Sequence, residues 1–342
     1  MAKHPPVVVI PNLNGGQALL DALSSLHKQT LRPHIIVVDN ASSDGSAERA
    51  QKKFPDIEVI WHKRNKGYAG GVNPGFERAI ERGATYVAPF NDDAAADPKW
   101  LKHLVGFLDT HPNHGAVCCK VLKDDGKHLD STGDFLTVWG LPYPRGRDEL
   151  DSGQYDDGAD VFAASGAASL FRVATLKKVG LFDEAFFAYY EDVDLGFRMQ
   201  NQGWKVGYEP RAIVHHAVGM TSGRIKGFTT YQTLKNLPLL VWKNVPFLLL
   251  FRILPRFYFA YILFFFRAFL RGHGISAIRG VCMSAFWLGW KLPEITLLDL
   301  KRKLNSRQVW SLLVHDLPPN AKTLRSLRTK WHKLTFRGSK DD

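Results

Sequence analysis

Three carboxylates stand close together in the segment GLFDEAFFAYYEDVDLGFRMQNQG, residues 180–203. Glu191, Asp192 and Asp194 directly follow a run of aromatic residues and precede an apolar, helix-forming stretch. Acidic residues in the first turn of a helix cap its free N–H groups, which accounts for one or two of the three. Aromatic neighbours also withdraw a carboxylate from water and raise its pKa toward the working range of a general base. The cluster therefore predicts an acid–base site, with a purely structural capping role as the alternative.

Two further polar groups follow predicted strands. Residues 91–93, Asn-Asp-Asp, come directly after the apolar run 85–90, and residues 215–216, His-His, end the run 205–216. Compact oxygen-rich groups of the first kind hold Mg²⁺ or Mn²⁺ together with a diphosphate. Acidic pairs are also common in turns, and histidines at strand ends are more often hydrogen-bonded surface residues than metal ligands. Each signal is weak alone, and the two together favour a divalent-metal site.

Apolar runs alternate with helical patterns along the first 216 residues. The predicted strands are 7–10, 35–38, 57–61, 85–90, 115–121 and 205–216, and the predicted helices are 17–29, 44–53, 74–82 and 97–109. A glycine-rich loop is expected before residue 74, and a long irregular loop at 138–160. This alternation predicts an α/β fold, a doubly wound, mostly parallel, Rossmann-like sheet whose ligands bind at the carboxyl ends of the strands. The polar groups lie at those ends.

Charge divides the chain into two parts. The 342 residues, 45% hydrophobic and 23% charged, have the composition of a globular protein of about two domains. Of the net charge of +12, residues 224–342 contribute 21 lysines and arginines against 5 acids, whereas residues 1–223 have 24 against 28. We expect a catalytic domain at 1–223 and a helical region at 224–342 with an anionic partner, nucleic acid or an acidic membrane. Three cysteines without a CxxC motif and an N-terminus without a signal-peptide pattern predict a cytoplasmic catalytic part.

The segment 236–272 is strongly apolar but is interrupted by Lys243, Arg252, Arg256 and Arg267 and by three prolines. Its longest charge-free run, 257–266, has half of the roughly 20 residues that a membrane-spanning helix needs. Basic side chains at a lipid interface extend toward the headgroups while aromatic side chains enter the acyl boundary. We therefore expect a helix in the plane of an anionic membrane surface, a peripheral position on the cytoplasmic face of the cell membrane, and no nucleic-acid partner.

Seven motifs are distributed along nearly all of the first 220 residues, in the order VVVIPNLNGG, IIVVDNASSDGS, NKGYAGGVNPG, FNDD, SGAASLFR, VGLFDEAFFAYYEDVDLGFR and PRAIVHH. They resemble the inverting family 2 glycosyltransferases of the GT-A fold, specifically their rhamnosyltransferase-like branch. The resemblance implies a hexosyltransferase that moves a sugar from a nucleoside-diphosphate donor to a hydroxyl group, with dTDP-L-rhamnose as the donor of this branch. The basic, apolar C-terminal region adds the expectation of a lipid-linked saccharide acceptor in cell-surface polysaccharide synthesis.

The same resemblance implies roles for individual residues. Asp192 would be the catalytic base, Asp93 and His215 the ligands of Mg²⁺ or Mn²⁺, and His216 a bystander. The donor site is implied at Pro11, Asn12, Asp39, Asn65, Gly70, Asn91 and Asp92, and the acceptor side at Ser165, Gly166, Glu191 and Asp194. At two places in the implied donor site this sequence differs from the family pattern. Leu13 stands where the family often has an aromatic residue against the base, and Asn-Asp-Asp replaces Asp-x-Asp, so that metal affinity depends more on Asp93 and the donor's phosphates.

Two other classes of protein are alternatives. A sugar nucleotidyltransferase needs a basic residue in a glycine-rich loop after the first strand, and PNLNGGQALL has none. A non-enzymatic membrane- or nucleic-acid-binding protein would use the basic C-terminal region as its binding surface, where the aliphatic and aromatic density around 247–270 favours lipid. ATP hydrolysis and NAD chemistry are disfavoured because no GxxxxGK[ST] loop is present and no GxGxxG motif follows the first strand.

Overall fold

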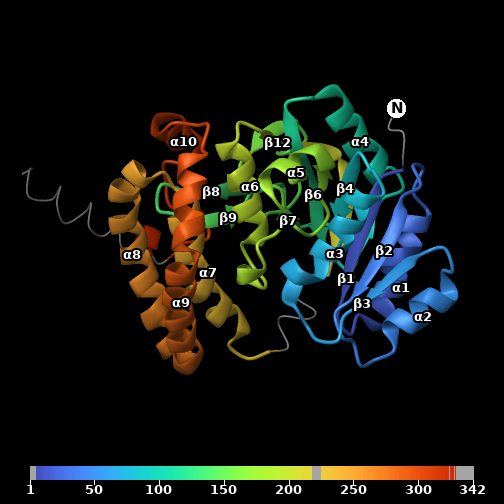
Figure 1. Cartoon of the computed structure of the whole chain (residues 1–342), viewed down its shortest axis with the longest axis horizontal. Helices are drawn as coiled ribbons and strands as arrows, with labels where there is room; N and C mark the ends of the chain where they lie inside the picture. The colour runs from blue at the N-terminus through green and yellow to red at the C-terminus, as the bar shows by residue number, and fades with distance from the viewer. Residues whose placement is uncertain (1–4, 218–224, 323, 327, 329–342) are drawn as a thin grey trace, which may run out of the picture.

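The computed structural model describes residues 5–217, 225–322, 324–326 and 328. Within them, a sheet with helices on both faces forms the N-terminal part, and helices α7 to α10 stand to one side of it (Figure 1). The predicted α/β fold with a mostly parallel sheet and a helical C-terminal region is confirmed. The predicted boundary between residues 223 and 224 lies outside the described residues.

Ten strands of the described chain form the main sheet, in the path order β10-β12-β6-β11-β4-β1-β2-β3, with β5 paired to β12 and β7 to β6. The strands are β1 (Val7–Asn12), β2 (His34–Asp39), β3 (Glu58–Trp61), β4 (Tyr86–Pro89), β5 (Ala94–Ala96), β6 (His114–Lys123), β7 (Leu129–Ser131), β10 (Ala159–Val161), β11 (Leu170–Arg172) and β12 (Lys205–His216), and a separate hairpin joins β8 (Asp134–Leu136) and β9 (Pro142–Pro144). β11 runs antiparallel between β4 and β6, and β10 runs antiparallel to β12 at the end of the path, while β1, β2, β4, β6 and β12 share one direction. The carboxyl ends of these five strands therefore meet at one edge.

Helices cover both faces of the sheet. One face carries α1 (Gly16–His27), α2 (Ser46–Lys53) and α4 (Trp100–Thr110), and the other carries α3 (Gly67–Glu81), α5 (Val173–Val179) and α6 (Glu191–Asn201), which follows a 3₁₀ turn at Glu184–Phe186. Alternate residues of β1 enter the two cores, Val8 with Leu23 of α1 and Val9 with Phe76 of α3. A strand buried on both faces reads as a continuous apolar run, which is why the sequence revealed it.

The C-terminal helices are α7 (Phe228–Asn244), α8 (Phe247–Leu270), α9 (Gly274–Leu300) and α10 (Ser306–Leu312). They share a third apolar core with the sheet part, in which Phe197 of α6 packs with Leu240 of α7. A Cβ added at Gly140, in the loop between β8 and β9, would lie 2.9 Å from Val241 of α7 and 3.1 Å from Phe257 of α8. The two parts of the chain are thus joined by close packing.

Two segments differ from their sequence-based prediction. Helix α3 begins at Gly67, where a loop was predicted up to Pro74. The glycines permit close packing: a Cβ at Gly67 would lie 2.3 Å from the Phe187 carbonyl oxygen, and one at Gly75 2.3 Å from Val9 Cγ1. The region 138–160, predicted to be irregular, contains β9 and the start of β10, which pair with β8 and β12.

We predict that Gly75→Ala lowers the free energy of unfolding by about 1–3 kcal/mol, because the new methyl group overpacks the contact between α3 and β1. The added carbon would meet both γ-methyl groups of Val9, at 2.3 and 2.6 Å, and a β-branched side chain has little freedom to turn away. Gly106→Ala in α4 is the matched control, since nothing lies within 4 Å of its Cβ position. Urea and thermal unfolding measure both variants, and equal midpoints would contradict the packing described here.

Candidate active site

Strands β1 and β2 end in a hydrogen-bonded pair of side chains. Their parallel register sets Asn12 opposite Asp39, and Asn12 Nδ2 donates to Asp39 Oδ1 at 2.8 Å. The Ser42 amide donates to Asp39 Oδ2 at 3.0 Å. Pro11 precedes them in β1, where its Cβ lies 3.2 Å from the Cβ position of Gly71 in α3. Asn12 and Asp39 are both buried, so these two predicted donor-site residues are held in place at the carboxyl edge of the sheet.

The residues directly after β4 lie at the same edge. The Leu13 amide donates to Asp92 Oδ2 at 3.4 Å, which connects them to the end of β1. Burial and the neighbouring carboxylate of Asp93 raise the pKa of Asp92 to about 7. The backbone N–H of Asn91 donates to the Ala167 carbonyl oxygen at 2.9 Å. The Asn-Asp-Asp motif is therefore bonded on one side to β1 and on the other to the segment before β11.

The two histidines of β12 lie in different environments, because successive side chains of a strand point to opposite faces. His216 Nε2 lies 3.0 Å from Asp93 Oδ1, and His216 Nδ1 lies 3.1 Å from Asp130 Oδ2. His215 is more exposed, and its Nε2 lies 3.7 Å from Asp97 Oδ1. The structure thus brings His216 to Asp93 and does not bring His215 there, whereas the family resemblance placed His215 with Asp93.

Asp194, in the first turn of α6, does not lie on the acceptor side that was predicted for it. It is fully buried, with Arg198 Nη2 at 2.8 Å and Lys243 Nζ at 3.1 Å from its carboxylate. Although burial opposes ionisation, these two cations hold the pKa of Asp194 below its ordinary value. Asp194 is an ion-pair partner inside the protein, because neighbours far along the chain enclose it.

The other two acids of α6 also differ from each other. Glu191 is 5% exposed, and burial raises its pKa well above the ordinary value. Asp192 remains partly exposed, its Oδ2 accepts a hydrogen bond from the Gly166 amide at 2.9 Å, and its Oδ1 accepts one from the Val193 amide at 2.8 Å. Burial raises the pKa of Asp192 as well. Asp192 is therefore the one acid of this cluster that is both fixed in place and partly accessible.

An aromatic turn at residues 186–190 leads into α6. Phe187, Tyr189 and Tyr190 have φ angles of 65°, 70° and 72°. Non-glycine residues in this region cost on the order of 1–3 kcal/mol each and persist only where the surroundings hold them. The strained turn fixes where α6 begins, and with it the position of Asp192.

The Tyr68 hydroxyl contacts the segment that holds Asp192. It donates to the carbonyl oxygen of Gly166, the residue whose amide binds Asp192. Burial raises the pKa of Tyr68 well above its ordinary value, and the carboxylates at positions 191, 192, 92 and 93 add to the rise. The acids of α6 and those after β4 therefore both act electrostatically on this hydroxyl group.

The remaining predicted residues shape the backbone around the site. Asn65 is exposed, and its Oδ1 accepts a hydrogen bond from the Gly67 amide at 2.7 Å at the start of α3. Gly70 is buried in the first turns of α3. The Ser165 carbonyl oxygen accepts a hydrogen bond from the Ser169 hydroxyl at 2.6 Å. These contacts order the chain before Tyr68 and around Gly166.

Sequence reasoning did not assign Tyr68, Asp130 or His216 to the site. The alternation of side chains along β12 shows that only one of the two histidines faces Asp93, but the sequence does not say which. Tyr68 lies inside the motif NKGYAGGVNPG and Asp130 in the segment LDSTGD. Nothing in their spacing alone indicates a contact with the acids of α6 or with β12.

The groups beside Asp93 fit a divalent cation. Although burial opposes ionisation of His216, its hydrogen bonds to Asp130 and Asp93 raise its pKa to about 9, and Asn91 Nδ2 also lies 3.0 Å from Nε2. A cation would replace the proton on Nε2 while Nδ1 stays bonded to Asp130, and a carboxylate behind the imidazole is typical of metal-binding histidines. Asn91 Oδ1 is buried and has no hydrogen-bond partner within the described part of the chain. Among the described residues, no group of three or more His, Cys, Asp or Glu side chains is arranged to hold a metal. A cation would therefore draw its other ligands from phosphate oxygens or water.

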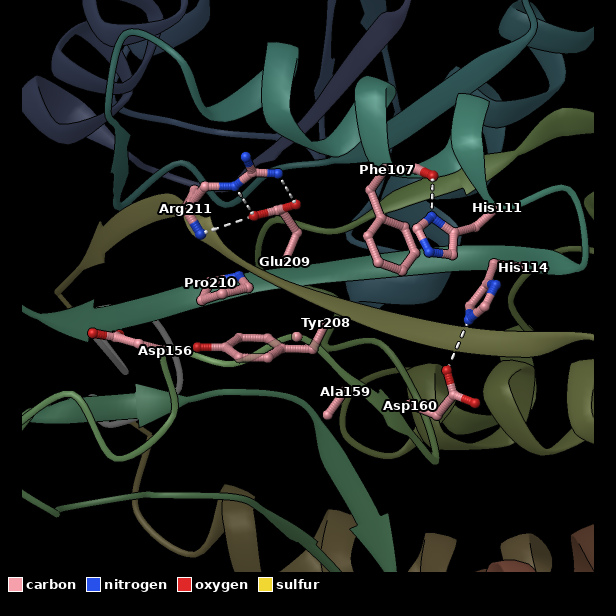
Figure 2. A pocket seen from close by; sticks show the side chains of 11 residues that line it. Phe107, His111, His114, Asp156, Ala159, Asp160, Tyr208, Glu209, Pro210 and Arg211 are labelled. Atoms are coloured by element: carbon pink, nitrogen blue, oxygen red, sulfur yellow. Dashed lines mark hydrogen bonds and ion pairs between the residues drawn. The ribbon is translucent and has the colours of Figure 1, made fainter.

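A separate cavity of about 490 Å³ lies beside the amino end of β6 and the middle of β12, residues 208–211 (Figure 2). His114, Asp160 and Tyr208 are among the residues that line it. His114 Nε2 lies 2.8 Å from Asp160 Oδ1. From Tyr208 to His216 the strand extends roughly 25 Å at about 3.3 Å per residue. The cavity includes none of the predicted site residues, so it is not the candidate active site.

The sequence profile of Glycosyl transferase family 2 matches residues 7–180, about half of the chain. The chain belongs to glycosyl transferase family 2. The predicted membership of this family is thereby confirmed. The profile match ends before Asp192 and His216, so the placement of these two residues in the glycosyltransferase's site rests on the geometry described above.

Curated relatives of this glycosyltransferase include rhamnosyltransferases. The N-acetylglucosaminyl-diphospho-decaprenol L-rhamnosyltransferase of Mycobacterium tuberculosis is 29% identical over 243 residues, which cover 64% of this chain and 78% of the relative. The dTDP-rhamnosyl transferase RfbF of Shigella flexneri is 27% identical over 228 residues, 63% of this chain and 73% of the relative.

Solved structures share the fold of this glycosyltransferase. GalNAc-T7 with UDP, GalNAc and Mn²⁺ superposes with a TM-score of 0.55 and 16% identity over 70% of this chain and 47% of that one. The mannosyltransferase PcManGT from Pyrobaculum calidifontis, with GDP-Man and Mn²⁺, gives a TM-score of 0.51 and 16% identity over 90% and 83%. At this identity the likeness establishes the GT-A-like fold and nothing finer.

Proposed function

We propose that this glycosyltransferase moves a sugar from a nucleoside-diphosphate donor to a hydroxyl group of a lipid-linked saccharide, in one step and with inversion at the anomeric carbon. The observation that carries the proposal is the position of Asp192, a partly exposed carboxylate held by the Gly166 amide; the next residue, Ala167, accepts a hydrogen bond from the Asn91 backbone N–H of the motif after β4. A base and a diphosphate-binding group at one edge of a sheet supply what the transfer needs.

In this reaction the Asp192 carboxylate accepts the proton of the acceptor hydroxyl while the hydroxyl oxygen bonds to the anomeric carbon. The bond from that carbon to the diphosphate oxygen breaks, and the nucleoside diphosphate leaves with the electron pair. Attack opposite to the leaving group inverts the configuration. A positioned base contributes about 10²–10⁴-fold to the rate of such a step.

Asp93 and His216 are the proposed residues for Mg²⁺ or Mn²⁺, with Asp130 orienting the imidazole ring. Such a cation, when bound, stabilises the negative charge that develops on the diphosphate. The proposed donor contacts are Asn12, Asp39 and the 91–93 segment, which share the carboxyl edge of the sheet. Two structures of the same fold hold Mn²⁺, which supports a divalent cation.

The proposed donor is dTDP-L-rhamnose, and the proposed acceptor is a saccharide on a polyprenyl diphosphate in cell-surface polysaccharide synthesis. The names of two relatives support this choice, an N-acetylglucosaminyl-diphospho-decaprenol L-rhamnosyltransferase and a dTDP-rhamnosyl transferase. A sugar nucleotidyltransferase loses its support, because the chain belongs to a family of glycosyl transferases.

The outer faces of α8 and α9 form an extended apolar surface. Exposed apolar residues on α8 include Leu248, Phe251, Phe259, Ile262, Phe266 and Phe269, and those on α9 include Ile275, Ile278, Met283, Phe286 and Trp290. The α8 residues recur at helical spacing along roughly 30 Å, at 1.5 Å per residue. Contiguous apolar surfaces of this kind mark a binding site, and its aromatic character favours lipid over nucleic acid.

Among the described helices, α8 is the one that is long and apolar enough to cross a membrane by length and composition. We propose that it lies in the plane of the interface, because its inner residues Ile253 and Phe257 are fully buried against the protein near Gly140. Exposed Arg252 and Arg256 would each cost about 2.5–3.5 kcal/mol at the centre of a span. At an anionic cytoplasmic leaflet each gains on the order of 1 kcal/mol instead, which supports a peripheral position there.

A screen of sugar nucleotides with the full chain and Mn²⁺ tests the function directly, and Asp192→Asn tests the base. We predict that this variant lowers kcat by about 10²-fold or more with donor KM nearly unchanged, because only the transition state needs the base. Activity should be lost as pH falls through the raised pKa of Asp192, so the acid limb of kcat lies above the ordinary value of about 3.9. Turnover close to that of the unmodified enzyme would exclude Asp192 as the base.

His216→Ala and Asp93→Ala should each weaken Mn²⁺ binding by about 10-fold or more, because each removes a ligand group from the same site. Calorimetric titration of Mn²⁺ in the presence of dTDP or UDP measures this without turnover. His215→Ala is the matched control and should bind Mn²⁺ normally, since His215 does not contact Asp93. Normal binding by His216→Ala, or an equal loss in both histidine variants, would refute the proposed site.

Replacing Phe251, Phe259 and Phe266 together by Glu should release the protein from vesicles that contain phosphatidylglycerol, because the apolar face is lost and the new charges repel the lipid. Leu150→Glu, at an apolar residue that is 57% exposed on the sheet part, is the control and should leave binding unchanged. Sedimentation with vesicles measures both variants. The unmodified protein should be extracted by alkaline carbonate, and retention would require a transmembrane segment.

A further inference from the structure

The turn that leads into α6 places several carbonyl groups in one small region. At Phe187, φ is 65° and ψ is −60°, and the Ala188 amide donates to the Phe186 carbonyl oxygen at 2.7 Å, which closes a three-residue turn. Tyr189 and Tyr190 continue with positive φ. A turn of this shape is strained, so it persists only where neighbouring groups stabilise it.

Helix α7 supplies those groups. Asn236 Nδ2 lies within donating distance of three carbonyl oxygens of the turn, those of Phe186 at 2.9 Å and of Ala188 and Tyr189 at 2.8 Å. Lys235 Nζ donates to the carbonyl oxygens of Ala185 and Phe186, both at 3.0 Å. Two consecutive residues of α7 thus satisfy most of the carbonyls that the turn exposes.

Water cannot replace these donors. Asn236 is fully buried and Lys235 is 4% exposed. Buried carbonyl groups without a donor are strongly disfavoured, so removing Asn236 leaves the turn free to change its shape. On its other side the turn contacts α3, where the Ala69 amide donates to the Phe187 carbonyl oxygen at 3.2 Å. The turn is therefore held between α3 and α7.

We propose that Asn236 is a positioning residue for the base, and that Lys235 assists it. Tyr190 is the last residue of the turn and the N-cap of α6, and Asp192 follows two residues later. A change in the turn therefore moves the Asp192 carboxylate relative to Gly166 and to the acceptor hydroxyl. The inference rests on the proposed role of Asp192, and it places part of the catalytic geometry in the C-terminal helices.

Asn236→Leu, which keeps the approximate size of the side chain and removes its donors, tests this role. We expect kcat to fall about 10- to 100-fold with donor KM nearly unchanged, since a displacement of about 1 Å can cost this much. Tyr261→Phe is the matched control, because the Tyr261 hydroxyl donates to the Leu234 carbonyl oxygen of α7 at 2.6 Å without contacting the turn. It removes one buried hydrogen bond from the same helix and should leave kcat unchanged. If Asn236→Leu does not fold, Asn236→Ser, which keeps one donor, replaces it in the same comparison.

The combination of Asn236→Leu with Asp192→Asn separates positioning from general destabilisation. If Asn236 acts through the base, its substitution has little further effect on kcat once the base is gone. Fully multiplicative losses in the double variant, or an equal fall in kcat for Tyr261→Phe, would overturn the positioning role. An Asp192→Asn enzyme that turns over normally overturns the proposed base itself, whereas loss in Asp192→Asn with normal turnover in Asn236→Leu overturns only the inference made here.

Discussion

The carboxylate of Asp194 is fully buried in the first turn of α6, and the cations around it join the sheet to the C-terminal helices. Arg198 comes from the same helix and Lys243 from α7, and Lys243 also contacts Asp183 at 2.6 Å. Lys291 of α9 lies 2.9 Å from the same Asp183 carboxylate. Removing one partner from such a buried network typically costs about 3–5 kcal/mol, because the remaining charge is left without compensation. Helix α6 is thus held electrostatically by the C-terminal helix α7, and Asp183, in the segment before α6, by α7 and α9.

Two acids of one helix turn have opposite electrostatic environments as a result. Cations near Asp194 hold its pKa below the ordinary value, whereas burial raises the pKa of Asp192. Both benefit from the free N–H groups at the helix start. The ion pairs of Asp194 fix the body of α6 and the contacts of α7 fix the turn before it, so that Asp192 lies between two restrained points.

Most of the sheet could be predicted from the sequence, because strands buried on both faces appear as short apolar runs and parallel strands gather their polar ends at one edge. The contact of Asn12 with Asp39 follows from that rule. The choice between His215 and His216 could not be predicted, since the pairing of β12 with β6 shifts register between Glu209 and Ile213. The structural role of Asp194 was equally hidden, because Lys243 follows it by 49 positions and only folding brings the two together.

The exposed apolar face of α8 runs along the whole helix. A protein bound to lipid through this face keeps a single orientation and diffuses in two dimensions. A molecule anchored in the same bilayer is then met by lateral motion alone. The quantity that governs such encounters is the number of anchored molecules per area of membrane, and the volume of the cell does not enter. In the membrane-bound state proposed above, changes in lipid composition that gather or separate the anchored molecules would act on this protein as a change of concentration acts on an enzyme in solution.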